Sequence, residues 1–327
     1  MTSKTPQYRD RLPQLGERIF IADGGLETTM IFLEDIDLPL FAAFPLIASD
    51  SGMARLEAYF RPYLRIARNN GTGIVLDTPT WRCSHGWGEQ LGYSRAEIAA
   101  FNHSSVDFLV DLRDRYQTPD LPVVINGAIG PQDDGYSPSN LMSRDEAQAY
   151  HAHQVDVFAD SAADMVTAVT MCYANEAIGI TRAAAAAGIP VAVSFTVETD
   201  GHLPDGMGLG EAIRLTDAAT GRYPAYYMIN CAHPSHFRDV LTGDRDWMRR
   251  IYGVRANASC MSHAELDEAT ELDDGNPGEF GEDYRELQGR LTNLRVVGGC
   301  CGTDHRHIAE VCRAIEHAPE PAPLKVA

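Results

Sequence analysis

The stretch AAAAAGIPVAVSFTV, residues 183–197, contains the two local patterns that decide the fold. Its five alanines favour a helix, and Gly188 provides the left-handed conformation that commonly ends one. Pro190 cannot continue a helix, and it opens a short apolar run that is typical of a buried strand. A helix followed closely by a buried strand predicts one unit of a parallel α/β sheet.

The same unit recurs along the chain. Apolar runs predict eight strands, at residues 18–25, 73–78, 122–128, 164–171, 190–197, 226–232, 251–257 and 294–301. Helix-like segments lie between and after them, near 52–70, 95–116, 143–162, 175–187, 210–220, 235–242, 282–292 and 304–317. Two of these helices are expected to begin with a capping box, Ser94 with Glu97 and Ser143 with Glu146. Eight units in one unbroken series predict an α/β protein with a single (β/α)8 TIM barrel.

The barrel is expected to fill residues 18–317 as one domain. Residues 1–17 are interpreted as an N-terminal leader that packs on the barrel, and the Pro-rich end, 318–327, as a flexible tail. The longest stretch outside the repeat, 258–281, is strongly acidic and contains several Gly and Pro residues. We expect a solvated loop there, in preference to a lid over an active site.

Composition limits the classes of partner. Among 327 residues, 44% are hydrophobic and 22% are charged, which is typical of a globular protein with a large core. The formal charge of -19 would repel polyanions, so nucleic acid and anionic membranes are not expected partners. The start of the chain has no apolar signal region, and the most apolar stretch is too short and interrupted for a membrane span, so a cytoplasmic location is expected.

Seven cysteines, an odd number without a secretory signal, do not suggest a disulfide framework. Metal or thiol chemistry is the alternative to consider. In a barrel of this type the active site lies at the carboxyl ends of the strands. There the sequence places glycines, side-chain carboxylates and amides, and three cysteines: Asp23, Gly24, Gly25, Asp77, Thr78, Asn126, Gly127, Asn230, Cys231, Asn257, Cys300 and Cys301.

Cys231, Cys300 and Cys301 are candidate metal ligands. Cys231 and Cys300 are 69 positions apart, which is unlike the compact spacing of a zinc finger. A closed barrel, however, places the sixth and eighth strands one strand apart, and neighbouring strands lie about 4.8 Å from each other. Three thiolates suit Zn²⁺ and leave a fourth position for water or substrate. Buried apolar cysteines, or a redox-active vicinal disulfide, are alternatives that the residues alone leave open.

The other cysteines and three histidines receive simpler interpretations. His233 is a candidate for a contact with substrate or with a metal ligand, and His305 and His307 are expected to face solvent or to cap a helix. The remaining cysteines are expected to pack in the protein interior: Cys83, Cys172, Cys260 and Cys312. For Cys172, which follows the fourth strand, lining of a pocket is also open.

The motifs GGCCGTDHRHI (298–308), INCAHP (229–234), DGGLETT (23–29), GAIGP (127–131) and SFTVETDGHLPDG (194–206) occur in the order found in one known family. The chain resembles the homocysteine S-methyltransferases over residues 18–317. The resemblance implies a methyltransferase in which Cys231, Cys300 and Cys301 hold zinc, and in which a substrate thiol takes the fourth position. It also implies that Asp23, Gly24 and Gly25 bind the amino acid substrate, with Asn230 and Asn257 as neighbours in the site.

The expected partners are therefore a small thiol acceptor, such as homocysteine, and a methyl donor; the sequence is also compatible with a homo-oligomer. The size of the chain resembles the compact branch of the family, which uses S-methylmethionine or S-adenosylmethionine and produces methionine. Such donors are sulfonium cations, which aromatic faces can bind. Four aromatic residues follow the second and third strands, although packing is the preferred interpretation for them: Trp81, Trp87, Tyr93 and Tyr136.

One position departs from the family. Where relatives have a Glu that receives the amino group of the substrate, this chain has Val169, and Glu176 lies at the start of the following helix. Loss of that anion should weaken recognition of an ammonium group. Methyl transfer to a different thiol, or demethylation of another methylated compound, therefore remains an alternative. Further alternatives are a non-catalytic barrel that binds zinc or thiol ligands, and a redox protein with a disulfide between Cys300 and Cys301.

Overall fold

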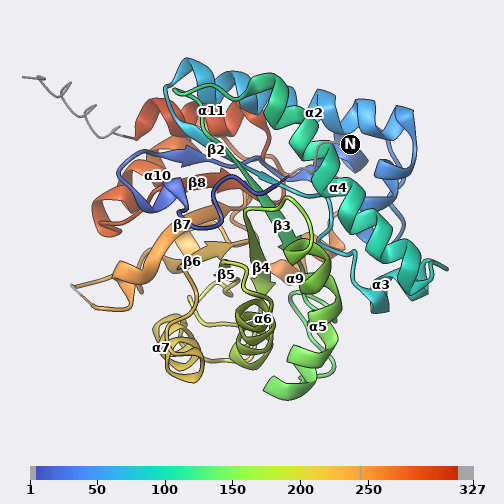
Figure 1. The fold of residues 1–327 in the computed structure, drawn as a ribbon. Helices are drawn as coiled ribbons and strands as arrows, with labels where there is room; N and C mark the ends of the chain where they lie inside the picture. The colour runs from blue at the N-terminus through green and yellow to red at the C-terminus, as the bar shows by residue number, and fades with distance from the viewer. Residues whose placement is uncertain (1–4, 244, 316–327) are drawn as a thin grey trace, which may run out of the picture.

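The computed structural model describes residues 5–243 and 245–315, and it consists of a closed barrel of eight parallel strands in chain order. Figure 1 shows the strands at the centre and the helices around them. The strands are β1 (Phe20–Ile21), β2 (Gly73–Asp77), β3 (Val123–Ile129), β4 (Met165–Met171), β5 (Val191–Phe195), β6 (Tyr226–Asn230), β7 (Ile251–Ala256) and β8 (Val296–Gly299). The (β/α)8 architecture predicted from the sequence is confirmed.

Helices follow the strands and cover the outside of the barrel. The longer ones are α2 (Asp50–Asn69), α4 (Arg95–Tyr116), α5 (Arg144–Ala159), α6 (Ala174–Ala187), α7 (Leu209–Thr220), α10 (Pro277–Arg290) and α11 (His305–Ala314). The short ones are α1 (Leu26–Thr28), α3 (His85–Gln90), α8 (Pro234–Phe237) and α9 (His263–Glu268). A π-helical turn at Thr29–Leu33 follows α1, and 3-10 turns occur at Pro13–Leu15, Pro39–Phe41, Phe44–Ala48 and Met248–Arg250.

The local signals for helix ends act as expected. At the start of α4, the Ser94 hydroxyl accepts a hydrogen bond from Glu97 N at 3.3 Å, and the Glu97 carboxylate accepts one from Ser94 N at 2.8 Å. The same capping box opens α5 at Ser143. Gly188 ends α6 with a φ of 68°, in the left-handed region that favours glycine.

Two predicted helices differ from the structure. The segment expected near 235–242 forms only one turn, α8, which begins at Pro234 directly after its capping residue His233. The helix expected at 282–292 begins five residues earlier, because Asn276 caps it and Pro277 occupies its first position, both good signals for a helix start. Part of the acidic stretch at 258–281 is therefore helical.

The described part of the leader, residues 5–17, packs against the end of the barrel where the strands begin. Leu12 and Gln14 are buried there, and Gln14 Nε2 lies 3.1 Å from the sulfur of Met165 in the first position of β4. Leu12 belongs to the apolar cluster inside the barrel, with Phe20, Val75, Val124, Met165, Ala192, Tyr226, Met228 and Val296. The leader thus closes the amino-terminal end of the barrel, so that a site for chemistry can open only at the carboxyl end.

A buried carboxylate anchors this leader. Asp164, which precedes β4, accepts hydrogen bonds from the backbone amides of Gln7 and Tyr8 through Oδ1. Its Oδ2 accepts from Arg113 Nη1 at 2.9 Å and from the amide of Ile125 at 2.9 Å. One carboxylate therefore links the leader, α4 and β3.

None of the helices in the described residues is long and apolar enough to cross a membrane. The tail expected at 318–327 lies outside the described residues.

Candidate functional site

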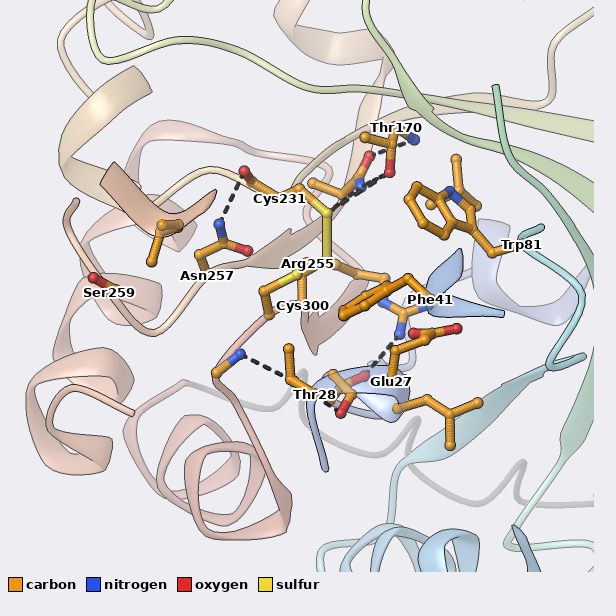
Figure 2. Close-up of a pocket in the computed structure, with 18 of the residues that line it drawn as sticks. Glu27, Thr28, Phe41, Trp81, Thr170, Cys231, Arg255, Asn257, Ser259 and Cys300 are labelled. Carbon is orange, nitrogen blue, oxygen red and sulfur yellow. Dashed lines mark hydrogen bonds between the residues drawn. A yellow bond between two sulfur atoms is a disulfide. The ribbon is translucent and has the colours of Figure 1, made fainter. Parts of the chain in front are cut away.

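A cavity of about 450 Å³ opens at the carboxyl ends of the barrel strands. Residues that end or follow β1, β2, β4, β6, β7 and β8 contribute to its wall, together with the segment after β7. Figure 2 shows the central part of this cavity, with the sulfur atoms of Cys231 and Cys300 at its middle. This is the end of a (β/α)8 barrel at which active sites form.

The three cysteines predicted to converge do so in this cavity. Cys231 follows β6, Cys300 and Cys301 follow β8, and their three sulfur atoms all lie within 4.8 Å of one another. Cys231 and Cys300 form a disulfide in the structure, with Cα atoms 5.4 Å apart, and Cys301 is free. The vicinal Cys300–Cys301 disulfide considered as an alternative is thus not the pair that forms.

When the disulfide is reduced, the cluster offers three thiol donors to one ion. Zinc accepts sulfur ligands in tetrahedral geometry at about 2.3 Å, so sulfurs that share one ion must lie within a few ångströms of each other. The three cysteines meet this requirement. The donor set and its spacing therefore fit zinc.

Cys231 is held in place from several sides. The amide of Asn230 donates from Nδ2 to the Cys231 sulfur at 3.0 Å and to Thr170 Oγ1 at 2.8 Å. The Cys231 carbonyl accepts from Asn257 Nδ2 at 3.1 Å and from His263 Nε2 at 2.6 Å. Asn230 and Asn257, both predicted as neighbours in the site, thus contact Cys231 directly, and both line the cavity.

Asp23 lies in the cavity wall, but its carboxylate is already engaged. Arg255, near the end of β7, forms ion pairs with both Asp23 and Asp77 and donates from Nε to the Gly299 carbonyl at 3.1 Å. Tyr59 also donates its hydroxyl to Asp23 Oδ2 at 3.1 Å. Burial raises the pKa of Asp23 to about 6, although the charge of Arg255 acts in the opposite direction.

Arg255 was not predicted from the sequence, although one signal pointed to it. It is the single charged residue in the strand IYGVRAN, and a charged side chain near the end of a barrel strand points to the site. Although burial lowers its pKa, the carboxylates of Asp23 and Asp77 raise it overall, so the guanidinium stays charged. Arg255 therefore neutralises two aspartates and connects four strand ends.

Gly24 and Gly25 allow the first strand to approach the eighth. A Cβ atom at Gly24 would lie 2.6 Å from the Thr303 carbonyl oxygen, and one at Gly25 would lie 2.7 Å from the Cys300 carbonyl oxygen. Any larger residue would push the segment away from the sulfur cluster. Both glycines line the cavity where they were predicted to lie.

Glu27 is a second residue that the sequence analysis did not single out. It lies in α1 and lines the cavity, and the labelled side chains in Figure 2 place it on the same side of the cavity as Phe41. Burial raises the pKa of Glu27 to about 7. DGGLETT was recognised as a motif, but the direction of this side chain could not be read from it.

The aromatic residues divide into two pairs. Trp81 and Tyr136 line the cavity, whereas Trp87 and Tyr93 are absent from its wall. Arg82 stacks on the rings of Trp81 and Trp87, at 4.8 and 3.8 Å from their centroids. For Trp87 and Tyr93 a role in packing fits the structure.

The segment 258–281 is not a solvated loop, and that interpretation was wrong. Residues from Ser259 to Asp273 contribute to the cavity wall, and α9 places His263 against Tyr136 with ring centroids 4.1 Å apart. Some of the acidic residues that suggested solvent exposure do face water, as Glu265 and Glu268 do, while Ala258, Ser259 and His263 are buried. The segment covers part of the site.

Several remaining candidates lie elsewhere. Val169 lines the cavity, but Glu176 is buried outside it, with Oε1 2.8 Å from His151 Nε2 and accepting from Gln132 N at 2.7 Å. His233 caps α8 and is not part of the cavity wall, so a contact with substrate or with a metal ligand stays a prediction for it. His307 takes part in the capping box of α11, as expected. Among the other cysteines, Cys83, Cys172 and Cys312 are buried and Cys260 is exposed.

Comparisons with known proteins agree with this arrangement. A family model described as homocysteine S-methyltransferase matches residues 20–315. A curated relative, methionine synthase of Mycobacterium leprae (strain TN), is 27% identical over 330 residues, which cover 94% of this chain and 25% of the relative. The chain thus spans about a quarter of the length of that protein.

Solved structures share the fold. The homocysteine methyltransferase MmuM from Escherichia coli matches in its oxidized form with a TM-score of 0.70 and 20% identity, over 90% of this chain and 94% of that chain. Its metallated form matches with a TM-score of 0.70 and 18% identity, over 90% and 96% of the two chains. At this level of identity the likeness supports the architecture.

Proposed function

The chain belongs to the homocysteine S-methyltransferase family and is a methyltransferase, and we propose that it is a zinc-dependent enzyme that methylates a thiol. The favoured acceptor is homocysteine, which would give methionine. The favoured donor is a sulfonium compound, S-methylmethionine or S-adenosylmethionine.

The convergence of Cys231, Cys300 and Cys301 in one cavity is the observation that carries this proposal. These residues would hold the zinc ion through their thiolates once the disulfide is reduced. Bound zinc would supply a Lewis acid that favours the thiolate form of the acceptor at neutral pH. Cavity residues from β1, β7 and the segment after β7 would then orient the acceptor and the donor.

The reaction is a direct displacement at carbon. The acceptor sulfur forms a bond to the methyl carbon, the bond between that carbon and the donor sulfur breaks with its electron pair, and the thiol proton is released. A cationic donor becomes neutral in this step, so a cavity that is partly shielded from water favours the transition state. Coverage of the site by α9 and its flanking residues supports such shielding.

A different acceptor thiol is the second candidate. Val169 provides an apolar side chain in the cavity wall, at a position where the resemblance to the family implied an acidic residue. An acceptor with no ammonium group would not require that acid. This candidate keeps the same cysteines, the same metal and the same reaction type.

The proposal is tested with the full chain purified under reducing conditions. Metal analysis is expected to give about one zinc ion per chain. Incubation with a panel of thiols and with each sulfonium donor, followed by mass spectrometry, is expected to show a methylated thiol. A reduced protein that takes up no zinc, or a zinc-loaded protein that methylates none of the thiols, would overturn the proposed function.

A further inference from the structure

The carboxylates of the cavity differ in what neutralises them. Asp23 and Asp77 share the guanidinium of Arg255. Asp134 accepts hydrogen bonds from the backbone amides of Tyr136 and Ser137, and Asp273 accepts one from Gly275. Two further acids at the rim of the cavity, Asp267 and Glu271, are exposed to water.

Glu27 differs from all of these. Within the described residues, no ion pair links it to an arginine and no side chain of another residue donates a hydrogen bond to it. Its side chain is partly buried, and burial is the largest influence on its acidity. A carboxylate that is partly withdrawn from water and forms no ion pair destabilises a protein, so its presence in a cavity points to a ligand that brings the partner.

The backbone fixes Glu27 beside the sulfur cluster. Gly25, two residues before it, approaches the Cys300 carbonyl so closely that a Cβ atom would lie 2.7 Å from the oxygen. Thr28, directly after it, accepts a hydrogen bond through Oγ1 from Gly302 N at 3.2 Å. The segment that carries Glu27 is therefore attached at both sides to the turn that carries Cys300 and Cys301.

Glu27 does not belong to the metal site itself. The group of side chains whose ligand atoms lie within 4.8 Å of one another contains only the three cysteines, among the described residues. Its carboxylate lines the same cavity as the three cysteines, and the neighbouring Thr28 is hydrogen-bonded to Gly302, the residue after Cys301. A group attached to a thiol held by the cluster would therefore come within reach of this carboxylate.

We propose that Glu27 binds the ammonium group of the acceptor and makes the enzyme selective for α-amino thiols. This inference rests on the proposed function and specifies its acceptor. The charges of the cavity carry it: Asp23 and Asp77 form ion pairs with Arg255, and Val169 is apolar. Glu27 lines the same cavity as the sulfurs and forms no ion pair within the described residues, although the charges of Arg255 and Arg82 act on it from a distance. Glu27 is thus a binding residue that determines specificity, while the sulfur cluster serves the reaction.

The test compares two acceptors that differ in one group. Homocysteine and 4-mercaptobutanoate have the same thiol and carboxylate, but only homocysteine has an ammonium group. The wild-type protein, loaded with zinc, is expected to prefer homocysteine in kcat/KM. Glu27→Gln keeps the size of the side chain and removes its charge. We expect it to lower kcat/KM for homocysteine by about 10- to 100-fold, the range for a lost charged hydrogen bond, and to change the value for 4-mercaptobutanoate by less than about threefold.

A matched control separates this effect from a general change of charge. Glu268→Gln removes the same charge from an exposed position on α9 that does not line the cavity, and it is expected to leave the preference unchanged. Zinc content and the KM for the donor should be the same in Glu27→Gln as in the wild type, which shows that the cluster and the donor site are intact.

The outcomes are distinguishable. An unchanged preference in Glu27→Gln, with turnover of both thiols, would overturn the role of Glu27 and leave the proposed function standing. A raised KM for the donor with an unchanged preference for homocysteine would assign Glu27 to the donor and also overturn the proposal. A wild-type protein that binds zinc and methylates neither thiol nor any other would overturn the proposed function and, with it, this inference.

Discussion

The two ends of the barrel differ in how completely their buried charged side chains are paired. At the amino-terminal end, Arg113 and Asp164 form a pair in which both side chains are almost fully buried, and Asp164 accepts three further hydrogen bonds from backbone amides. At the carboxyl end, two aspartates share Arg255, and Glu27 forms no ion pair among the described residues, although the charges of Arg255 and Arg82 reach it. The first end is organised for stability, and the second keeps an excess of negative charge beside a sulfur cluster.

Several residues other than glycine have positive φ values at or near the cavity, although Arg222, in the turn before β6, also has one. Thr170 and Cys231 have positive φ values of 63° and 54°, and Leu40 and Phe41 have values of 54° and 59°. Thr170, Cys231 and Phe41 line the cavity. Residues other than glycine rarely adopt this conformation, and where they do, the surrounding structure must compensate for the strain. The comparison therefore predicts that changes at the carboxyl end alter chemistry, and that changes at the amino-terminal end alter stability.

The largest expected effect is at the sulfur cluster. Cys300→Ser removes one of the three thiols, and we expect it to abolish stoichiometric zinc binding and to reduce methyl transfer by at least about 10³-fold, because a thiolate ligand is lost. The free energy of unfolding of the reduced protein should change by less than about 1 kcal/mol. Metal analysis, turnover and urea unfolding measure the three quantities.

Cys260→Ser is the matched control for this prediction. Cys260 is an exposed thiol in the segment that covers the cavity, and it is not part of the cluster. Its substitution should leave zinc content and turnover as in the wild type. A Cys300→Ser protein that retains a full equivalent of zinc would contradict the assignment of the cluster.

At the opposite end, Asp164→Asn should affect stability alone. The substitution leaves Arg113 as an unpaired buried charge, and we expect a loss of about 3–5 kcal/mol in the free energy of unfolding. Urea unfolding provides the measurement, and zinc content should remain about one ion per chain. Asp160→Asn, at an exposed position close by, should change stability by less than about 0.5 kcal/mol. A loss of zinc in folded Asp164→Asn would break the division between the two ends.

The leader should contribute less to the free energy of unfolding than the buried Arg113–Asp164 pair does. Leu12 is 5% exposed and packs in the cluster inside the barrel, so Leu12→Ala is expected to lower the free energy of unfolding by about 2–4 kcal/mol through lost burial and a cavity. Leu15→Ala is the matched control, because Leu15 is 42% exposed in the same turn. Equal losses in the two variants would mean that the leader does not close the barrel as the structure indicates.

The part of this arrangement that depends on local pattern was predictable from the sequence. Residues 183–197 form the end of α6 and the whole of β5, because alanines, Gly188 and Pro190 act within a few residues. The convergence of Cys231 with Cys300 also followed, since closing the barrel brings the ends of β6 and β8 together although the two cysteines are 69 positions apart. The expected first strand, 18–25, pairs only at Phe20–Ile21, and its later residues turn along the cavity instead.

The pairing of charges was not predictable in this way. Arg255 meets Asp23 and Asp77, residues more than 170 positions away, and Glu27 forms no ion pair among the described residues. Which charged residues form ion pairs depends on the direction and length of side chains from different strands. Residues 258–273 were misjudged for a related reason: their acidic composition indicated solvent, but only one side of the segment faces it.

The smallest expected effect is a gain in stability at the carboxyl end. Burial raises the pKa of Glu27 from an ordinary value of 4.5 to about 7, so the folded protein holds this proton more tightly than the unfolded chain does. Stability is therefore lost as the pH rises from about 4.5 to 7. Glu27→Gln removes this penalty, and we expect it to raise the free energy of unfolding by about 2 kcal/mol at pH 8, with little change near pH 4.5. Urea unfolding at the two pH values measures it, with Glu268→Gln as the control. A variant that is less stable than the wild type at pH 8 would mean that the folded protein itself already satisfies the carboxylate, and that the two ends do not differ in the way proposed.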